Sequence, residues 1–451
     1  MKNICFIANY YKTGVFIEIA KGLMQYGLRP YWIVPNFKQY ISLKTHFHED
    51  RLLYIGKKEV LASKTEAREF DLKINELIHG DRVLRYESEK WKFKYLAKLK
   101  DLYYVFIEKN QIQFIFGELT WAHELVAYRL TLQAVNLNCE YLNPHTIRIP
   151  NRRFAFFSDE FQSKIKEVNV ELATPASTRI INLEKPSYLA LNNKILNNKR
   201  TIEYNLTKLK NFIFRTNQDS NDPTLYNSAF TLFKIRTKEI YNRIVFKNFV
   251  KETKIEELPQ NKSFILFTLH KQPEASIDVI GRYYENQLEL ITNIWRILPQ
   301  EYILLVKEHS NAIGDRSVSF YKKVKSLKNV ILIEHREDSH KILEKTEAVF
   351  TVSGTIAYEA ALKGIYAYTF APTFFNKLNA CRKVSWSTYR NIKSFKELSI
   401  STKNDNRIKF SDWLFSNSFE GIMSDAFSDP RCMEKENILK LVNAFLKVTK
   451  C

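Results

Sequence analysis

Charged and hydroxyl side chains directly follow several short apolar runs in this sequence. Ser353-Gly354-Thr355 comes after the apolar residues 348–352 and before an apolar-rich stretch at 356–363. If the first run is a strand and the second a helix, the turn presents free backbone N–H groups, two hydroxyls and a positive dipole end, which suit a phosphate. Glu359 would lie one turn into the helix and could accept hydrogen bonds from a ribose. An ordinary capped helix with an exposed glutamate is the alternative.

Two more groups of ionisable residues follow apolar runs in the same half of the chain. Lys307-Glu308-His309 comes after 302–306, and His270-Lys271-Gln272-Pro273-Glu274 comes at the end of 264–269. Histidine changes charge near neutral pH, and lysine supplies the positive charge that attracts a phosphate. We therefore predict that these residues bind an anionic substrate. The alternatives are a structural histidine that caps the next helix and, for the second group, a solvated run of charges.

Possible proton acceptors are found in the first half of the sequence. Glu118 follows the short apolar run 114–116, and His123-Glu124 stands near the start of a helix expected at about 121–134. A carboxylate beside a histidine is suited to removing a proton from a hydroxyl group, whereas a charged helix N-terminus is the alternative. Glu118 is the first choice because it follows a strand directly. Glu274 is the alternative catalytic carboxylate.

The spacing of apolar residues predicts the elements that hold these groups. Short apolar runs alternate with segments of helical spacing over 3–34 and again over 263–370. This alternation is typical of doubly wound parallel sheets, whose ligands lie at the carboxyl ends of the strands. A polar, basic loop is expected at 143–153. We predict an α/β fold with two Rossmann-like lobes, divided into an N-terminal lobe at 1–160, a helical, partly irregular connection at 161–260 with an exposed loop at 193–200, a C-terminal lobe at 261–430 and a final helix at 431–451.

The composition excludes several classes of protein. Lysine and arginine outnumber aspartate and glutamate by 69 to 49, and the resulting net charge of +20 attracts phosphates or anionic lipid. No nucleic-acid-binding motif accompanies the charge, so we predict no nucleic-acid partner.

The five scattered cysteines fit a reducing cytosol. The sequence has no D-x-D near a strand end and no G-x-G-x-x-G, so we predict neither a metal nor a cofactor. No apolar run approaches the roughly 20 residues that span a bilayer, so any membrane contact is expected at the surface.

At these residues the sequence resembles the capsule polysaccharide biosynthesis protein family, which includes the Kdo transferases that build capsule linkers. The similarity covers about 114–159 and 262–375. The motifs that carry it are Gly117-Glu118 with His123-Glu124, Leu142-Asn143-Pro144-His145, Gln272-Pro273-Glu274-Ala275-Ser276, Lys307-Glu308-His309, Gly314-Asp315-Arg316, and Ser353-Gly354-Thr355 with Glu359-Ala360.

The resemblance implies a GT-B fold, with a nucleotide-sugar donor on the C-terminal lobe and a glycan or glycolipid acceptor on the N-terminal lobe. It implies work at the cytosolic face of the inner membrane, in peripheral contact with anionic lipid and capsule assembly proteins, and it adds Arg316 to the substrate-binding residues. Related transferases often carry His-Pro where this sequence has His309-Ser310, so no particular donor is implied. The first hypothesis is a metal-independent glycosyltransferase. A sugar-nucleotide epimerase, a polyol-phosphate transferase and a non-catalytic assembly subunit are the alternatives.

Overall fold

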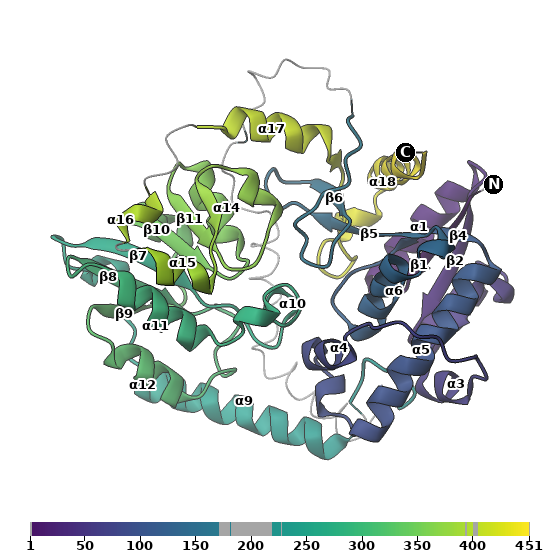
Figure 1. Ribbon diagram of the computed structural model, residues 1–451, viewed down its shortest axis with the longest axis horizontal. Helices are drawn as coiled ribbons and strands as arrows, with labels where there is room; N and C mark the ends of the chain where they lie inside the picture. Colours follow the sequence, from purple (N-terminus) through teal and green to yellow (C-terminus); the bar gives the residue numbers. More distant parts are fainter. Residues whose placement is uncertain are drawn as a thin grey trace.

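The computed structural model describes residues 2–170, 181, 219–226, 228–392, 395–399 and 405–450. These residues form two α/β lobes, and helix α9 (Ala229–Phe249) runs from one lobe to the other along one edge of the molecule (Figure 1). The predicted α/β class, with two Rossmann-like lobes in a GT-B-like arrangement, is confirmed. The loop expected at 193–200 lies outside the described residues.

The N-terminal lobe is built on a seven-stranded sheet in the order β13-β6-β5-β4-β1-β2-β3. The five strands from β5 to β3 in this order pair in parallel. Strand β6 pairs antiparallel with both of its neighbours, β5 and β13. The strands are β1 (Asn3–Ile7), β2 (Arg29–Val34), β3 (Leu52–Tyr54), β4 (Ile112–Phe116), β5 (Glu140–Thr146), β6 (Arg153–Phe157) and β13 (Phe419–Glu420). The helices are α1 (Lys12–Met24), α2 (Phe37–Lys44), α3 (Lys57–Ala62), α4 (Ile74–Gly80), α5 (Glu89–Lys109) and α6 (Ala122–Gln133).

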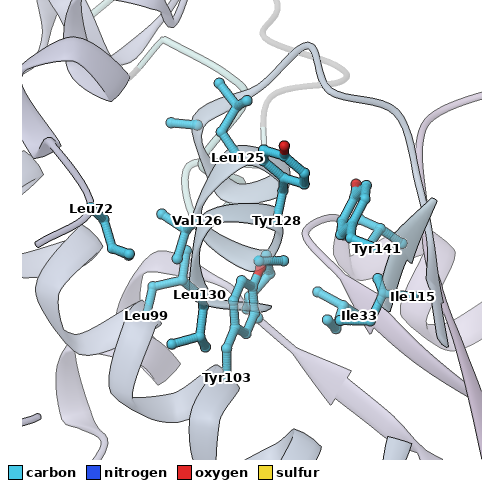
Figure 2. Close-up of a cluster of buried hydrophobic side chains, with 14 of the residues drawn as sticks. Ile33, Leu72, Leu99, Tyr103, Ile115, Leu125, Val126, Tyr128, Leu130 and Tyr141 are labelled. Carbon is cyan, nitrogen blue, oxygen red and sulfur yellow. The ribbon is translucent and has the colours of Figure 1, made fainter. Parts of the chain in front are cut away.

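Apolar packing against α6 fixes one face of this sheet. The strands are covered on both faces, so they appear in the sequence as continuous apolar runs. Figure 2 shows side chains of α6 between the neighbouring helices and the sheet. The α6 side chains are Leu125, Val126 and Leu130. They pack against Leu72 and Leu99 on the helical side and against Ile33, Ile115 and Tyr141 of the sheet. This packing holds the start of α6, and with it the loop at 117–121 that carries Glu118.

The C-terminal lobe has a six-stranded sheet in the order β12-β11-β10-β7-β8-β9, with every pair parallel. Five of its strands were predicted to within two residues at each end. The strands are β7 (Ser263–Thr268), β8 (Tyr302–Lys307), β9 (Val330–Ile333), β10 (Thr346–Thr351), β11 (Tyr366–Thr369) and β12 (Cys381–Lys383). The helices are α10 (Ala275–Asp278), α11 (Gln287–Ile297), α12 (Val318–Ser326), α13 (Ser339–Leu343), α14 (Thr355–Leu362), α15 (Trp386–Asn391), α16 (Lys396–Ser399) and α17 (Arg407–Ser416).

The chain returns to the N-terminal lobe near its end. After α17, β13 pairs with β6, so the path crosses back before the expected boundary at 430. Helix α18 (Lys435–Lys450) then packs on α1, where a Cβ at Gly22 would lie 2.5 Å from Val442 Cγ2. A second difference concerns the loop expected at 143–153, because Asn143, Pro144 and His145 lie in β5 and pair with β6.

Four buried charges join the two lobes. Arg282 follows α10 in the C-terminal lobe, and its guanidinium lies 2.5 Å from Glu76 Oε1 and 2.6 Å from Glu160 Oε1. Arg129 on α6 lies 2.5 Å from Glu76 Oε1 and 2.9 Å from Glu160 Oε2. Two positive and two negative side chains therefore share one contact between the lobes. We call these residues, Glu76, Arg129, Glu160 and Arg282, the interlobe charge cluster.

The return of α18 to the N-terminal lobe has a measurable consequence. Phe445 is fully buried, and its ring centroid lies 4.7 Å from that of Phe116 and 4.9 Å from that of Phe156. Phe445→Ala should lower the free energy of unfolding by about 3 to 5 kcal/mol, measured by urea denaturation. Leu439→Ala on the same helix is the control, since Leu439 is 57% exposed. Equal stability of the two variants would contradict the packing of α18 against this sheet.

Candidate active site

The loops after β7 and β10 meet where the strand order of the C-terminal sheet reverses, which is the usual ligand position in such sheets. His270 Nε2 lies 3.0 Å from Thr351 Oγ1 and accepts a hydrogen bond from the Ser353 backbone N–H at 3.2 Å. Ser353 Oγ donates to the Ser276 carbonyl at 2.9 Å. Burial lowers the pKa of His270 to about 3, so its imidazole is neutral. His270 therefore holds the turn before α14 in shape.

Glycine is required at position 354 for space and not for backbone conformation. The φ angle of Gly354 is −70°, which any residue adopts. A Cβ at this position would lie 2.6 Å from Thr351 Oγ1 and 3.5 Å from two atoms of the His270 ring. The absence of a side chain therefore lets this turn pack closely against Thr351 and His270.

The first turn of α14 has open hydrogen-bonding groups. Thr355 is its first residue, and its hydroxyl has no partner in the described part of the chain. Glu359, one turn further on, lies 2.9 Å through Oε2 from His340 Nε2. Burial raises the pKa of Glu359, while the charge of His340 opposes the shift. Glu359 Oε1 has no partner within the described ranges, so one carboxylate oxygen can still accept a hydrogen bond.

Glu308 and Arg316, both predicted to bind substrate, are bound to each other. Arg316 Nη1 lies 2.7 Å from both oxygens of Glu308, and the Tyr321 hydroxyl donates to Glu308 Oε2 at 2.7 Å. Arg316 also donates to the His270 carbonyl. Glu308 is fully buried and accepts a further bond from the His309 backbone N–H at 2.7 Å. This pair therefore links the loops after β7 and β8.

Lys307 and His309 point to different places after β8. Lys307 Nζ donates to the His335 carbonyl at 3.0 Å, which ties β8 to the loop after β9. His309 Nδ1 accepts a hydrogen bond from the Asn311 backbone N–H at 3.2 Å, so its proton is assigned to Nε2. Burial lowers the pKa of His309, although the charge of Glu274 opposes the shift. His309 thus offers a neutral N–H donor.

Asp278 on α10 organises the loop after β7. Its carboxylate accepts hydrogen bonds from Gln272 Nε2 at 3.2 Å and from the Glu274 backbone N–H at 3.0 Å. It also forms an ion pair at 3.0 Å with Arg85 of the N-terminal lobe. Gln272 is therefore occupied by Asp278, whereas Lys271 has no ion pair or hydrogen bond in the described part of the chain.

Glu118 is held by Asn9 of the loop after β1 and by Lys12, the first residue of α1. Lys12 Nζ donates to Glu118 Oε1 at 2.9 Å and to the Pro144 carbonyl at 3.2 Å. Asn9 Nδ2 donates to Glu118 Oε2 at 3.0 Å. Burial opposes ionisation, but the charge and hydrogen bond of Lys12 outweigh it, so the pKa of Glu118 lies below its usual 4.5. Glu118 is an oriented carboxylate whose side chain stays 24% exposed.

Glu124 and His123 lie deeper than Glu118. Glu124 is fully buried, and its Oε2 accepts the backbone N–H groups of Thr120 at 2.8 Å and Trp121 at 3.0 Å. Burial raises the pKa of Glu124 to about 7, and the charge of Glu118 adds to the shift. Burial lowers the pKa of His123 to about 3. Glu124 therefore shapes the loop before α6, and His123 is a neutral buried imidazole.

The carboxyl edges of the two sheets face each other. The Tyr358 hydroxyl on α14 donates to the Ile149 carbonyl, in the loop after β5, at 2.9 Å. Burial raises the pKa of Glu359, and the charge of Arg148 in the same loop is among those that oppose this shift. These contacts place the loop after β5 against α14. Lys12 joins Pro144 of β5 to Glu118, so Glu118 lies at the same edge of the N-terminal sheet.

Several residues of this arrangement were not predicted. Asn9 and Lys12 lie in the turn from β1 into α1, and the rule that ligands lie at strand ends could have found them. The partnerships of His340 with Glu359 and of Asp278 with Arg85 join distant segments and have no local signal. In the described ranges no three histidine, cysteine, aspartate or glutamate side chains are grouped to hold a metal, and no helix there is long and apolar enough to cross a membrane.

The raised pKa of Glu124 predicts a pH dependence of stability. Because the folded pKa exceeds the usual 4.5, the folded protein holds an extra proton between pH 4.5 and about 7. That stabilisation is complete below pH 4.5 and is lost as the pH rises through 7. Relative to Glu124→Gln, the wild type should lose on the order of 3 kcal/mol of unfolding free energy over this range, measured by urea denaturation. The exposed Glu66→Gln is the control, and parallel pH profiles for wild type and Glu124→Gln would contradict the prediction.

No protein-family model matches the chain, and no curated protein matches it in sequence. Solved structures align with most of the chain at low identity and low TM-score. The beta Kdo 2,7 transferase of KpsC from Thermosulfurimonas dismutans aligns over 99% of this chain and 100% of that chain, at 11% identity and a TM-score of 0.39. A putative UDP-N-acetylglucosamine 2-epimerase from Listeria monocytogenes aligns over 100% of this chain and 96% of that chain, at 11% identity and a TM-score of 0.27. The calicheamicin glycosyltransferase CalG4 aligns over 92% of this chain and 95% of that chain, at 9% identity and a TM-score of 0.27. At these identities and TM-scores the likeness assigns neither a substrate nor a reaction to this chain.

Proposed function

We propose that the protein transfers a sugar from a nucleotide-sugar donor to a hydroxyl group of a glycan or glycolipid acceptor. The observation that carries the proposal is the pairing of two unlike sheet edges. One edge has an open helix N-terminus at the reversal of strand order, and the facing edge has a carboxylate oriented by a lysine. The first suits the phosphates of a donor and the second suits a reacting hydroxyl.

The donor is held by the C-terminal lobe. Its phosphates accept hydrogen bonds from the first backbone N–H groups of α14 and from the Thr355 hydroxyl, and Lys271 adds positive charge. Glu359 Oε1 accepts a hydrogen bond from a ribose hydroxyl. His309 donates through Nε2 to the departing phosphate. Glu308 and Arg316 do not touch the donor in this proposal; they hold the loops that do.

Glu118 removes the proton from the acceptor. The acceptor oxygen forms a bond to the anomeric carbon of the sugar while the bond from that carbon to the phosphate oxygen breaks. The nucleotide leaves with the bonding electrons, and the hydroxyl proton passes to Glu118. Lys12 keeps Glu118 ionised beforehand, and Asn9 fixes its orientation. Glu274, on the donor side, remains the alternative base.

The acceptor class and the metal-independent mechanism are further parts of the proposal. The motifs shared with capsule polysaccharide biosynthesis proteins support a glycan or glycolipid of a bacterial surface polysaccharide, made at the cytosolic side of the membrane. The donor is identified first, by a thermal-shift screen of CMP-, UDP-, GDP- and CDP-sugars, because a ligand that binds only the folded state raises its stability. Conversion of the donor to an epimer without acceptor would overturn glycosyl transfer in favour of epimerisation.

Removal of the base should slow transfer without weakening donor binding. Glu118→Gln keeps the size of the side chain, so donor affinity measured by calorimetry should stay within a few fold. The transfer rate should fall by about 10² to 10⁴. Glu18→Gln on α1 is the control, since its carboxylate is 40% exposed and pairs with Lys21 on the surface. A near wild-type rate for Glu118→Gln together with an inactive Glu274→Gln would move the base to the C-terminal lobe.

A side chain at position 354 should block the donor. Gly354→Ala puts a methyl group 2.6 Å from Thr351 Oγ1 and disturbs the turn before α14. We expect donor affinity to fall by at least about tenfold, a loss of about 1.4 kcal/mol, in the folded variant. Gly14→Ala is the control, because a Cβ there meets nothing within 4 Å. Unchanged donor affinity in Gly354→Ala would contradict the phosphate position.

A further inference from the structure

Helix α9 has one face against the protein and one face outward. On the inner face Asn242 Nδ2 donates to the Gly314 carbonyl at 3.1 Å, and the Phe246 ring packs on that of Tyr321 with centroids 4.9 Å apart. Asn242 and Phe246 are the buried residues of this 21-residue helix. Figure 1 shows α9 along one edge of the molecule, from the N-terminal lobe to the C-terminal lobe. Most of its side chains therefore face away from the core.

The outward face of α9 is apolar. Phe230 is 74% exposed, Phe233 54%, Ile240 56%, Tyr241 67% and Ile244 55%. At 100° per residue these positions fall on one side of the helix, opposite Asn242 and Phe246. Single exposed apolar residues are ordinary, but five on one side of a helix, interrupted only by Thr237, mark an interaction surface. We call these five residues the α9 stripe.

Basic residues flank the α9 stripe. The helix carries Lys234, Arg236, Lys238, Arg243 and Lys247 against one acid, Glu239. By the same geometry, two of the basic residues lie on one side of the stripe and three on the other. Glu239 is paired with Arg236 at 2.7 Å, so the acid offers little to an incoming cation. The charge around the stripe is therefore positive.

Further lysines lie at the C-terminal end of α9, on the side of the helix that faces α12 and away from the α9 stripe. A groove there is lined by Phe249 and Val250 on one side and by Lys322, Lys325 and Tyr321 of α12 on the other. Phe249 is 73% exposed, so another large apolar side chain stands beside two further cations. The same combination of exposed aromatic and basic groups is repeated where the helix ends.

We propose that the outward face of α9 docks on an anionic lipid bilayer, with the α9 stripe at the level of the headgroups and the flanking cations on the lipid phosphates. An apolar face bordered by lysine and arginine is typical of helices that lie in the membrane interface. An apolar protein partner would need the stripe but not the cations on both sides of it. The net charge of +20 alone predicts attraction to the surface, whereas the stripe predicts insertion at defined residues. The proposal holds whether or not the protein transfers a sugar.

The test is sedimentation of the full-length chain with vesicles of phosphatidylcholine, with or without phosphatidylglycerol. At about 0.1 M salt, where charges are screened over about 10 Å, we expect binding to the anionic vesicles and little to the neutral ones. Ile240→Ser with Ile244→Ser should weaken that binding by at least about tenfold. The matched control is Leu132→Ser with Leu439→Ser, which changes leucines that are 58% and 57% exposed on α6 and α18.

Charge is tested in the same way. Lys238→Glu with Lys247→Glu should weaken binding to anionic vesicles and flatten its dependence on salt, whereas Lys90→Glu with Lys109→Glu on α5 should have a much smaller effect. Circular dichroism and thermal unfolding check the fold, and the single substitutions replace any double variant that fails it. Wild-type binding by the Ile240 and Ile244 variant would overturn the proposal. Ultracentrifugation tests the other occupant of this face, a second copy of the chain. If the wild type self-associates and this variant does not, while the variant still binds vesicles, the stripe is an interface between copies and the proposal is overturned.

Discussion

The relative position of the two lobes depends on the interlobe charge cluster. Its four side chains are between 8% and 18% exposed, so each charge relies on its partners instead of water. Removing one member of such a cluster leaves an unpaired buried charge, which typically costs about 3 to 5 kcal/mol. Arg282 follows α10, the element that carries Asp278, and Arg129 lies on α6, just after the loop of Glu118. The cluster therefore fixes the distance between the two halves of the candidate site.

Each lobe also uses a buried ion pair to orient the loops after its strands. In the C-terminal lobe Glu308 and Arg316 tie the loop after β8 to the carbonyl of His270. In the N-terminal lobe Lys12 bridges Glu118 and the Pro144 carbonyl of β5. Burying these charges is costly unless all their hydrogen bonds are made, and here they are made by backbone and side-chain partners. The partly buried groups next to them, such as the Thr355 hydroxyl and His309 Nε2, are then left free to meet a ligand.

The sequence predicted the elements better than the contacts between them. Buried parallel strands appear as apolar runs, so the C-terminal strands and the turn at Ser353 were found. The last part of β5, at 143–145, was taken for part of a loop because Asn143 and Pro144 are poor strand formers. Pro144 is tolerated there because β5 pairs with β4 only as far as Leu142, which leaves the proline nitrogen without a partner to bond. The pairing of Lys12 with Glu118 spans 106 residues, and no local pattern could have indicated it.

The candidate base and its buried neighbour form a connected pair of carboxylates. Asn9 Nδ2 donates to Glu118 at 3.0 Å and to Glu124 at 3.1 Å, so one amide group orients both. Lys12 favours ionisation of Glu118, while burial and the charge of Glu118 keep the proton on Glu124 up to about pH 7. Glu118 is thus charged and partly exposed, and Glu124 is neutral and buried. A proton lost from Glu124 would put a second negative charge beside Glu118 and make it a stronger base, so the buried residue sets the reactivity of the exposed one.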